Sequence, residues 1–152
     1  AKAVQYLIPS IEAMMAEGVL HRPHFHVVVM DPSIRPGDST SFEEAILYEQ
    51  SFYDGDDWEN PYDEIARAKA KITWQTGLPT HVVMETMPYV LEDGDTRYYG
   101  SAVVNGLIVA VSGFKPWFDE MVSTWIAAAC RASAIHLMQT KIGPSDKAFL
   151  EA

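Results

Sequence analysis

The sequence predicts an α+β domain in which helices cover an antiparallel sheet of about four to five strands, with a long helix near the C-terminus. Two short apolar runs flank Asn105–Gly106, a pair that favours the type I′ turn of a β-hairpin. Apolar residues at three- and four-residue spacing, typical of amphipathic helices, precede and follow the strand segments. The strands form hairpins and lack the crossover pattern of a parallel sheet, which places the chain in the α+β class.

One compact domain is expected to span residues 1–152. The chain has 152 residues, of which 48% are hydrophobic, and its four Trp, seven Tyr and six Phe supply bulky side chains for a core. One hydrophobic core commonly serves about 100 to 200 residues, so two domains would be cramped. The residues from Ser145 to Ala152 follow Gly143–Pro144 and are predicted to form a loosely held tail.

The first predicted element is an amphipathic helix. Apolar residues recur at helical spacing from Val4 to Met15, and Gly18 supplies a stop. Pro9 is tolerated in the first turn of a helix, so the regular part is expected to begin near Ser10.

Two strands are predicted next. The β-branched and apolar run Phe25–Met30 has the composition of a strand buried on both faces. Residues 33–41 contain Pro36–Gly37 and polar side chains, which predict a loop. The alternating run Ala45–Phe52 then predicts a second strand, so the two strands are expected to form a long hairpin.

A second helix is predicted after an acidic loop. Asn60 is expected to cap it, Pro61 to occupy its first position and Gly77 to end it. Its buried face is expected to include Ile65, Ala68 and Ile72.

The last third of the chain is predicted to contain a short helix, a hairpin and a long helix. The segment Thr80–Leu91 is predicted as a short helix capped by Thr80, and the alternative, because of Val82–Met84 and Pro88, is an irregular covering segment. The hairpin strands are Ser101–Val104 and Leu107–Ser112. The long helix begins at Pro116 and ends near Lys141. One face of it is traced by Met121, Val122, Trp125, Ile126, Ala129, Ser133 and Leu137.

The charge of the chain disfavours two classes of partner, and its cysteine content bears on the cellular compartment. The net charge of −10 disfavours nucleic acid and anionic membrane surfaces, which reward clustered Lys and Arg. No apolar run approaches the roughly 20 residues of a membrane span, and no signal peptide is evident at the start. Cys130 is the only cysteine, so nothing demands an oxidising compartment. We expect a cytoplasmic protein, with a mature secreted form as the alternative.

Three segments carry a resemblance to a known family. They are Val27–Asp31, Ile65–Ala70 and, most specifically, Val104–Gly113 followed by Asp119–Glu120. In these segments the sequence resembles the GlcG/HbpS-like haem-degrading domain family, and the resemblance covers most of the chain. The chain departs from the family pattern in two respects. The glycine-rich segment expected before the hairpin is reduced to Tyr98–Ser101, and the loop from Tyr53 to Asn60 is unusually long and acidic.

The resemblance implies a profilin-like fold, assembly into homo-oligomers and haem as a candidate cofactor. The family includes haem-binding proteins and the C-terminal part of some corrinoid adenosyltransferases. Because function belongs to the site and not to the scaffold, the chain's own polar residues have to identify the ligand.

Three histidines cluster at the entrance to the first strand. His21, His24 and His26 form a His-x-x-His-x-His pattern, and strand alternation would point His24 and His26 to the same face. Neutral imidazoles can bind a transition metal or a haem iron. The alternative is a solvated histidine-rich connector with one ring packed locally.

Three further residues are candidates for ligand contacts. His81 follows Pro79–Thr80, where an imidazole near a helix start could face an anion. Arg67 and Lys69 could bind a carboxylate or a haem propionate, and surface ion pairing is the simpler alternative.

No metal site is expected in the acidic stretch of Asp54, Asp56, Asp57 and Glu59. It offers oxygen ligands but lacks the glycine and the terminal glutamate of an EF-hand loop. The chain also lacks a nucleophile elbow, a zincin motif, a phosphate-binding loop and a dinucleotide-binding fingerprint. Cys130 lies mid-helix, a position that suits packing more than nucleophilic attack.

These observations predict a homo-oligomeric protein that binds a small molecule or cofactor, with haem as the candidate from the resemblance. The alternative is an isomerase-, dehydratase- or cyclase-type enzyme in which His81 and His26 perform acid/base chemistry. A third possibility is a structural or assembly subunit whose surfaces serve only contacts with partners.

Overall fold

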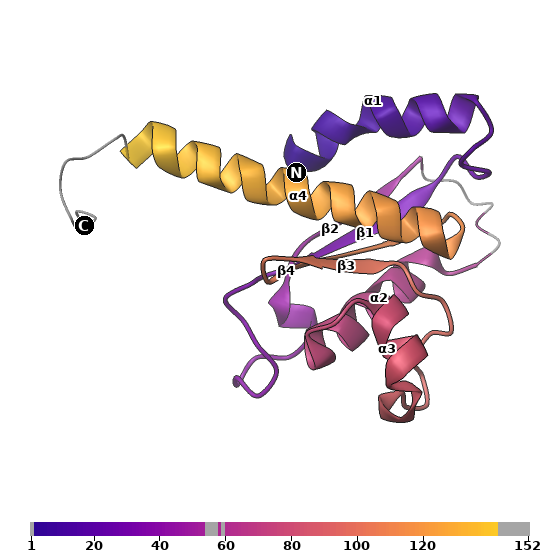
Figure 1. The fold of residues 1–152 in the computed structure, drawn as a ribbon, viewed down its shortest axis with the longest axis vertical. Coiled ribbons are helices and arrows are strands. Elements are labelled where there is room, and N and C mark those ends of the chain that lie inside the picture. Colours follow the sequence, from indigo (N-terminus) through magenta and orange to yellow (C-terminus); the bar gives the residue numbers. More distant parts are fainter. Residues whose placement is uncertain (1, 54–57, 59, 143–152) are drawn as a thin grey trace.

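The computed structural model describes residues 2–53, 58 and 60–142, and in them helices pack on both faces of a four-stranded antiparallel sheet (Figure 1). This confirms the predicted α+β class and the long C-terminal helix. The strand order across the sheet is β2-β1-β4-β3. The elements in chain order are α1 (Lys2–Ala16), β1 (Phe25–Met30), η1 (Glu43–Ala45), β2 (Ile46–Phe52), α2 (Tyr62–Thr76), α3 (Thr80–Thr86), η2 (Pro88–Val90), β3 (Ser101–Val104), β4 (Leu107–Ser112) and α4 (Pro116–Ile142).

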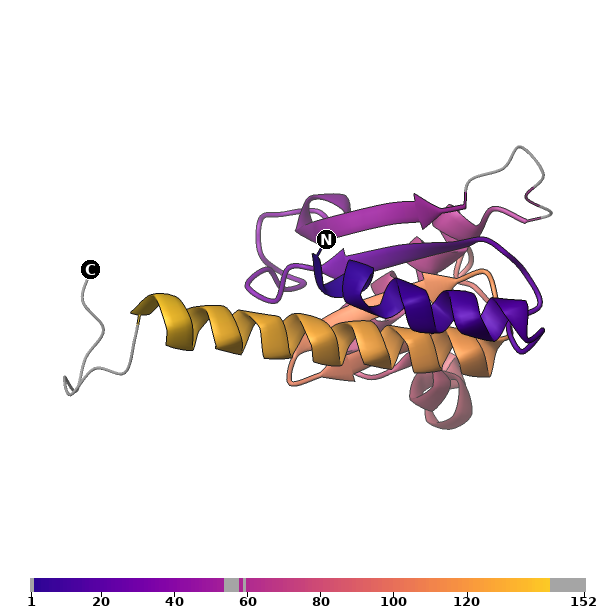
Figure 2. The same ribbon diagram turned by 90° about the horizontal axis from the view of Figure 1, so that it is seen from above.

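One face of the sheet is covered by α4, and α1 packs alongside that helix (Figures 1 and 2). The core on this side gathers alternate residues of the central strands, including Val27 and Val109, against Ile11 of α1 and Ile126 of α4. Phe25 stacks on Phe52, with ring centroids 4.8 Å apart, and closes one end of this core. The period of two along the strands therefore places one apolar set under α1 and α4.

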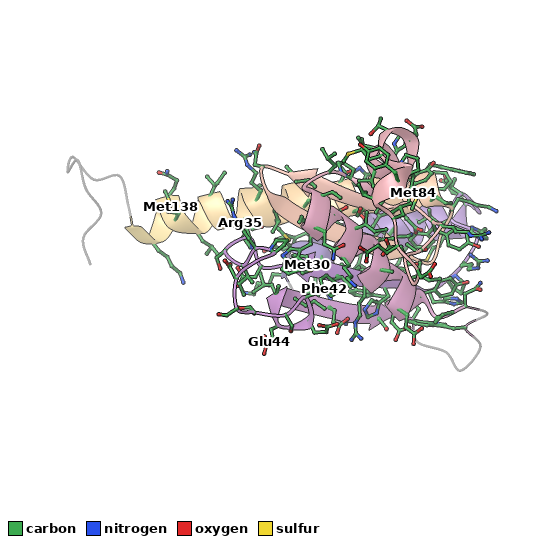
Figure 3. All side chains as sticks on the ribbon, turned by 90° about the horizontal axis from the view of Figure 1, so that it is seen from below. Met30, Arg35, Phe42, Glu44, Met84 and Met138 are labelled. Carbon is green, nitrogen blue, oxygen red and sulfur yellow. The ribbon has the colours of Figure 1, made fainter. Side chains whose placement is uncertain are left out.

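The opposite face is covered by α2, with α3 beside it (Figure 1). The other alternate set of strand residues, including Val28 and Ala110, packs there against Ala66 and Ala70 of α2. Phe42 and Met30 extend this second core at the end of β1 (Figure 3). All six residues of β1 are buried, which confirms the prediction of a strand covered on both faces.

The predicted hairpin is confirmed, with Val104 paired to Leu107 across the turn. Asn105 and Gly106 have φ values of 48° and 83°, the left-handed conformation that both central residues of a type I′ turn require. Asparagine and glycine tolerate this conformation, which explains why the local sequence was sufficient to predict the turn.

Several predicted helix details are wrong. Helix α1 begins at Lys2 and contains Pro9, because burial of Ala3 and Val4 supports the part of the helix before the proline. Pro61 and not Asn60 occupies the cap position of α2, and no side chain caps that helix. Ile65 and Ala68 are only half-buried, since the face turned to the sheet comprises Tyr62, Ala66, Lys69, Ala70, Ile72 and Thr73.

The segment predicted as one helix over residues 80–91 is shorter and divided. Helix α3 ends at Thr86, and Pro88 begins the separate turn η2. Thr80 does not cap α3, because its hydroxyl accepts hydrogen bonds from Gly100 N and Ser101 N at 2.9 and 3.1 Å. The hydroxyl of Thr80 therefore binds the N–H groups at the start of β3 and does not cap its own helix.

Helix α4 extends past the end of the sheet (Figures 1 and 2). The prediction of its buried face is right for Val122 and Ile126, but Leu137 is 51% exposed. The hairpin turn marks where the helix leaves the sheet, since the Asn105 amide faces the Arg131 guanidinium. The tail predicted over residues 145–152 lies outside the described residues. Among the described helices, none has the length and apolar character of a membrane span.

Candidate functional site

A small cavity lies where the connector before β1, the segment before β3, the end of β4 and the first turns of α2 and α4 meet. Its volume is about 200 Å³. The polar and charged residues on its wall include Lys69, Asp119, Tyr62 and Lys115, and Ile65 and Phe114 supply apolar surface. Pockets for drug-sized ligands usually measure about 300 to 1,000 Å³, so this cavity suits a molecule of a few heavy atoms.

A buried ion pair forms one wall of the cavity. Lys69 Nζ lies 2.8 Å from Asp119 Oδ2, and their side chains are 1% and 3% exposed. Lys69 also donates to the carbonyl of Val111 at 2.9 Å. Strand β3 begins at Ser101, opposite Ala110, so its ladder stops before Val111 and the ammonium supplies the donor there.

The two charges belong to helices on opposite faces of the sheet, α2 and α4. Lys69 lies on the face of α2 that also carries Ala66 and Thr73, three and four residues away, and so it is turned inward. Asp119 lies in the first turn of α4, where its Oδ1 accepts a hydrogen bond from Phe114 N at 2.9 Å. One carboxylate thus stabilises the entry into α4 and binds the lysine.

Gly100 makes room for the pair. A Cβ at this position would lie 2.7 Å from Asp119 Cβ and 2.8 Å from Lys69 Nζ. Its φ of +150° also disfavours L side chains. The single glycine retained in the Tyr98–Ser101 segment is therefore at the position where the backbone approaches the ion pair.

Burial shifts both pKa values of the pair towards the neutral forms. It lowers the pKa of Lys69, and the charge and hydrogen bond of Asp119 oppose that shift. It raises the pKa of Asp119 to about 6, against the lowering effects of Lys69 and of the Phe114 N–H. Shifts of this kind, caused by desolvation and one specific partner beside a cavity, are frequent at functional sites.

Tyr62 brings an unsatisfied hydroxyl to the same cavity. The residue is 4% exposed, and its buried hydroxyl has no hydrogen-bond partner among the described residues. Its ring is fixed by neighbours, since it packs 5.3 Å from the ring of His24 and 5.4 Å from the guanidinium of Arg22. A buried polar group without a partner costs about 1 to 3 kcal/mol, so this hydroxyl calls for an explanation.

A network of buried hydroxyls holds Gly100 in place from three helices. Thr80 accepts from its N–H, and Ser123 of α4 donates to its carbonyl. Ser101 Oγ lies 2.6 Å from Thr73 Oγ1 of α2 and 2.9 Å from Thr80 Oγ1. Because Thr73, Thr80, Ser101 and Ser123 are all fully buried, the network fixes the approach of the backbone to the ion pair.

The histidine cluster is divided between two environments. His26 is buried, with Nδ1 2.8 Å from Ser51 Oγ and Nε2 3.0 Å from Glu49 Oε2. His24 lies just before β1 and packs against the rings of Trp58 and Tyr62, next to the cavity. His21 is exposed in the connector before the strand.

The predicted cations also differ in their surroundings. Lys69 lines the cavity, whereas Arg67 forms a two-pronged hydrogen-bonded pair with Glu49 of β2. Hydrogen bonding from Arg67 lowers the pKa of Glu49, and Glu49 raises the pKa of Arg67. This arrangement corresponds to the ion-pair alternative for Arg67.

His81 lies outside the cavity, on the exposed side of α3. Its Nε2 is 2.9 Å from Glu85 Oε1, its Nδ1 is 3.3 Å from Glu120 Oε2, and its ring stacks on Tyr99 at 5.0 Å. The hydrogen bond to Glu85, assisted by the charge of Glu120, raises the pKa of His81. The structure does not bring His81 together with His26, which contacts strand β2 instead.

The remaining sequence-based candidates lie elsewhere. The acidic positions 54, 56, 57 and 59 fall outside the described residues. Within the described part, no group of three or more His, Cys, Asp or Glu side chains could hold a metal ion. Cys130 is half-buried and burial raises its pKa, which opposes formation of a thiolate. A wider hollow at the other end of the sheet, beside Trp74 and Asn105, lacks a buried charged pair in its described wall.

Comparison with known proteins gives no family assignment: no protein-family model, curated protein or solved structure matches the chain.

Sequence reasoning missed Asp119, Tyr62 and Gly100 as parts of one site. Asp119 entered only as part of an acidic helix start, and nothing in the sequence pattern singled out Tyr62. The available signal was Lys69, whose three- and four-residue spacing from Ala66 and Thr73 puts a cation on the buried face. A buried lysine requires a carboxylate partner, and this requirement could have prompted a search for one.

Removing one member of the ion pair is expected to be far more destabilising than removing both. Lys69→Met or Asp119→Asn alone should lower the free energy of unfolding by about 3 to 5 kcal/mol, because each leaves a buried charge without its partner. The double variant should recover most of that loss, since the amide oxygen introduced by Asp119→Asn can still accept the bond from Phe114 N. Urea denaturation of the wild type and the three variants measures the coupling, and additive losses would contradict the interpretation.

The imidazole of His81 is expected to titrate above the ordinary pKa of 6.5. Its stabilising pairing with Glu85 and Glu120 is then present below pH 6.5 and is lost as the pH rises through the folded-state pKa. Glu85→Gln should lower the NMR-measured pKa of His81, while Glu92→Gln, a remote exposed substitution, should leave it unchanged. Equal values in wild type and Glu85→Gln would show that the pairing does not form in solution.

Proposed function

We propose that the chain is a small-molecule-binding protein whose ligand occupies the cavity between Lys69, Asp119 and Tyr62. The observation that carries the proposal is the buried Tyr62 hydroxyl, which has no partner among the described residues and lines the same cavity as a fully buried ion pair. Concave sites with apolar walls and a few convergent polar groups are the usual form of ligand sites. Membership of the GlcG/HbpS-like family stays a prediction that rests on the sequence segments.

Haem is not carried into this proposal, because two of the residues expected to bind it, His26 and Arg67, are engaged by other side chains. His26 has both ring nitrogens engaged, by Ser51 and Glu49, and so presents no nitrogen to an iron. Arg67 is held by Glu49, away from a propionate role. The cavity of about 200 Å³ is also smaller than the lower limit of about 300 Å³ for pockets that hold drug-sized ligands, and a porphyrin is larger than most of these.

For the enzymatic alternative, the structure favours Lys69 and Asp119 over the predicted pair of His81 and His26. His81 has two carboxylate neighbours, but its side chain is 41% exposed and it faces a hollow separate from the cavity. The groups with perturbed pKa values beside the cavity are Lys69 and Asp119. Binding is therefore the better supported activity, and a turnover reaction would have to involve this pair.

The binding proposal predicts that hits from a library of small fragments will contact the cavity. In ¹H–¹⁵N NMR spectra, binding should shift the amide signals of Tyr62, Lys69 and Phe114, and leave that of Trp74 unchanged. Tyr62→Phe should weaken binding about two- to tenfold, the usual effect of one lost hydrogen bond. Tyr89→Phe, at an exposed tyrosine, is the matched control. Shifts confined to the Trp74 hollow, or a silent Tyr62→Phe variant, would contradict the proposal.

We also propose that the chain self-associates through the end of α4. Residues 132–142 contain a single charged side chain, Lys141, and expose Ile135, Leu137 and Met138. Figure 3 shows Met138 on this part of the helix. An isolated helix of this length is marginal in water, so burial against a partner would stabilise it. A second copy is a suitable partner because it brings the same exposed apolar residues of α4 to the contact.

Self-association predicts a dimer or larger assembly in sedimentation velocity. Replacing Leu137 and Met138 together by Glu should shift the protein to monomer, because the helix face that the assembly would bury becomes charged. Tyr89→Glu, at another exposed apolar residue, should leave the assembly unchanged. A wild-type monomer at all concentrations would exclude this interface.

A further inference from the structure

Resting on the proposed ligand cavity, we infer that its ligand is a small carboxylate with a short apolar tail. The carboxylate would lie against Lys69, Tyr62 and Lys115, and the tail against Ile65 and Phe114. Hydrogen-bonding capacity that the protein's own contacts leave unused on the cavity wall points to this class of molecule.

The only described carboxylate on the cavity wall is already satisfied. Asp119 Oδ2 accepts from Lys69 and Oδ1 accepts from Phe114 N. It therefore has little capacity left to bind a donor or a cation from the ligand. Charge on this wall does not favour a cationic ligand.

Lys69 and Tyr62 have donor capacity that their contacts with the described residues leave unused. A lysine ammonium has three N–H groups, and Lys69 directs two of them towards Val111 O and Asp119 within the described part of the chain. The Tyr62 hydroxyl has no acceptor among the same residues. Lys115, exposed at the rim, adds a further positive charge. Two donors beside a cation match the two oxygens of a carboxylate, and bonds to ionised acceptors are the stronger class.

The apolar part of the wall distinguishes a carboxylate from an inorganic anion. Ile65, Phe114 and Pro116 line the cavity, and their side chains offer no hydrogen bond. A short alkyl tail would remove this surface from water, whereas phosphate or sulfate would leave it without a partner. The volume of about 200 Å³ limits the tail to a few carbons.

The test compares propionate with propionamide, its neutral isostere, and with inorganic phosphate at constant ionic strength. Affinities come from the NMR shifts of the Tyr62, Lys69 and Phe114 amides in the full chain. Propionate is expected to bind at least about tenfold more tightly than propionamide, because the amide lacks the charge-assisted bonds. Lys115→Gln should weaken propionate severalfold without affecting propionamide, and Lys71→Gln, at an exposed lysine of α2, should affect neither.

The outcomes distinguish the carboxylate assignment from the ligand cavity itself. Equal affinity for propionate and propionamide, or tighter binding of phosphate, would overturn the carboxylate assignment and leave a ligand cavity in place. The same holds if only neutral or cationic fragments shift these amides. If no fragment of any charge perturbs them, both the cavity proposal and the carboxylate inference fail.

Discussion

The buried ion pair between Lys69 and Asp119 is the constraint on which the rest of the structure depends. It joins α2, which lies on one face of the sheet, to α4 on the other, and it satisfies the Val111 carbonyl of β4 beyond the reach of β3. Desolvating two charges costs several kcal/mol per ion, so the pair is tolerated only with good geometry and further hydrogen bonds. Both conditions are met, and together they fix the relative positions of the two helix layers.

Gly100 and the hydroxylated residues around it allow the backbone to lie against the ion pair. The backbone can approach the pair because Gly100 has no side chain, and Thr80 and Ser123 bind its N–H and carbonyl. Four buried hydroxyls would be destabilising one by one, yet as a network each has a partner. The contact explains why a short helix begins at Thr80 and why a glycine precedes the hairpin: Thr80 and Gly100 meet beside the ion pair.

The sequence predicted those parts of the fold that short-range physics determines. The β1 run and the Asn105–Gly106 turn were right because composition and φ preference act within a few residues. The site was only partly predictable, since Lys69 and Asp119 are 50 residues apart and each alone resembles a solvated charge. Thr80 was misjudged for the same reason, because its partners Gly100 and Ser101 are distant in sequence.

A role in stability would explain the ion pair but not the open cavity beside it. A purely structural lysine and carboxylate would be as stable, or more stable, if packed residues filled the space beside them. Here the space stays open, and Lys69 and the Tyr62 hydroxyl, which has no partner among the described residues, lie on its wall. Leaving buried donors without acceptors costs free energy that a bound acceptor would recover. The cavity is thus a weak point of the fold in isolation, and a ligand with acceptor oxygens would turn it into a stabilising contact between the two helix layers.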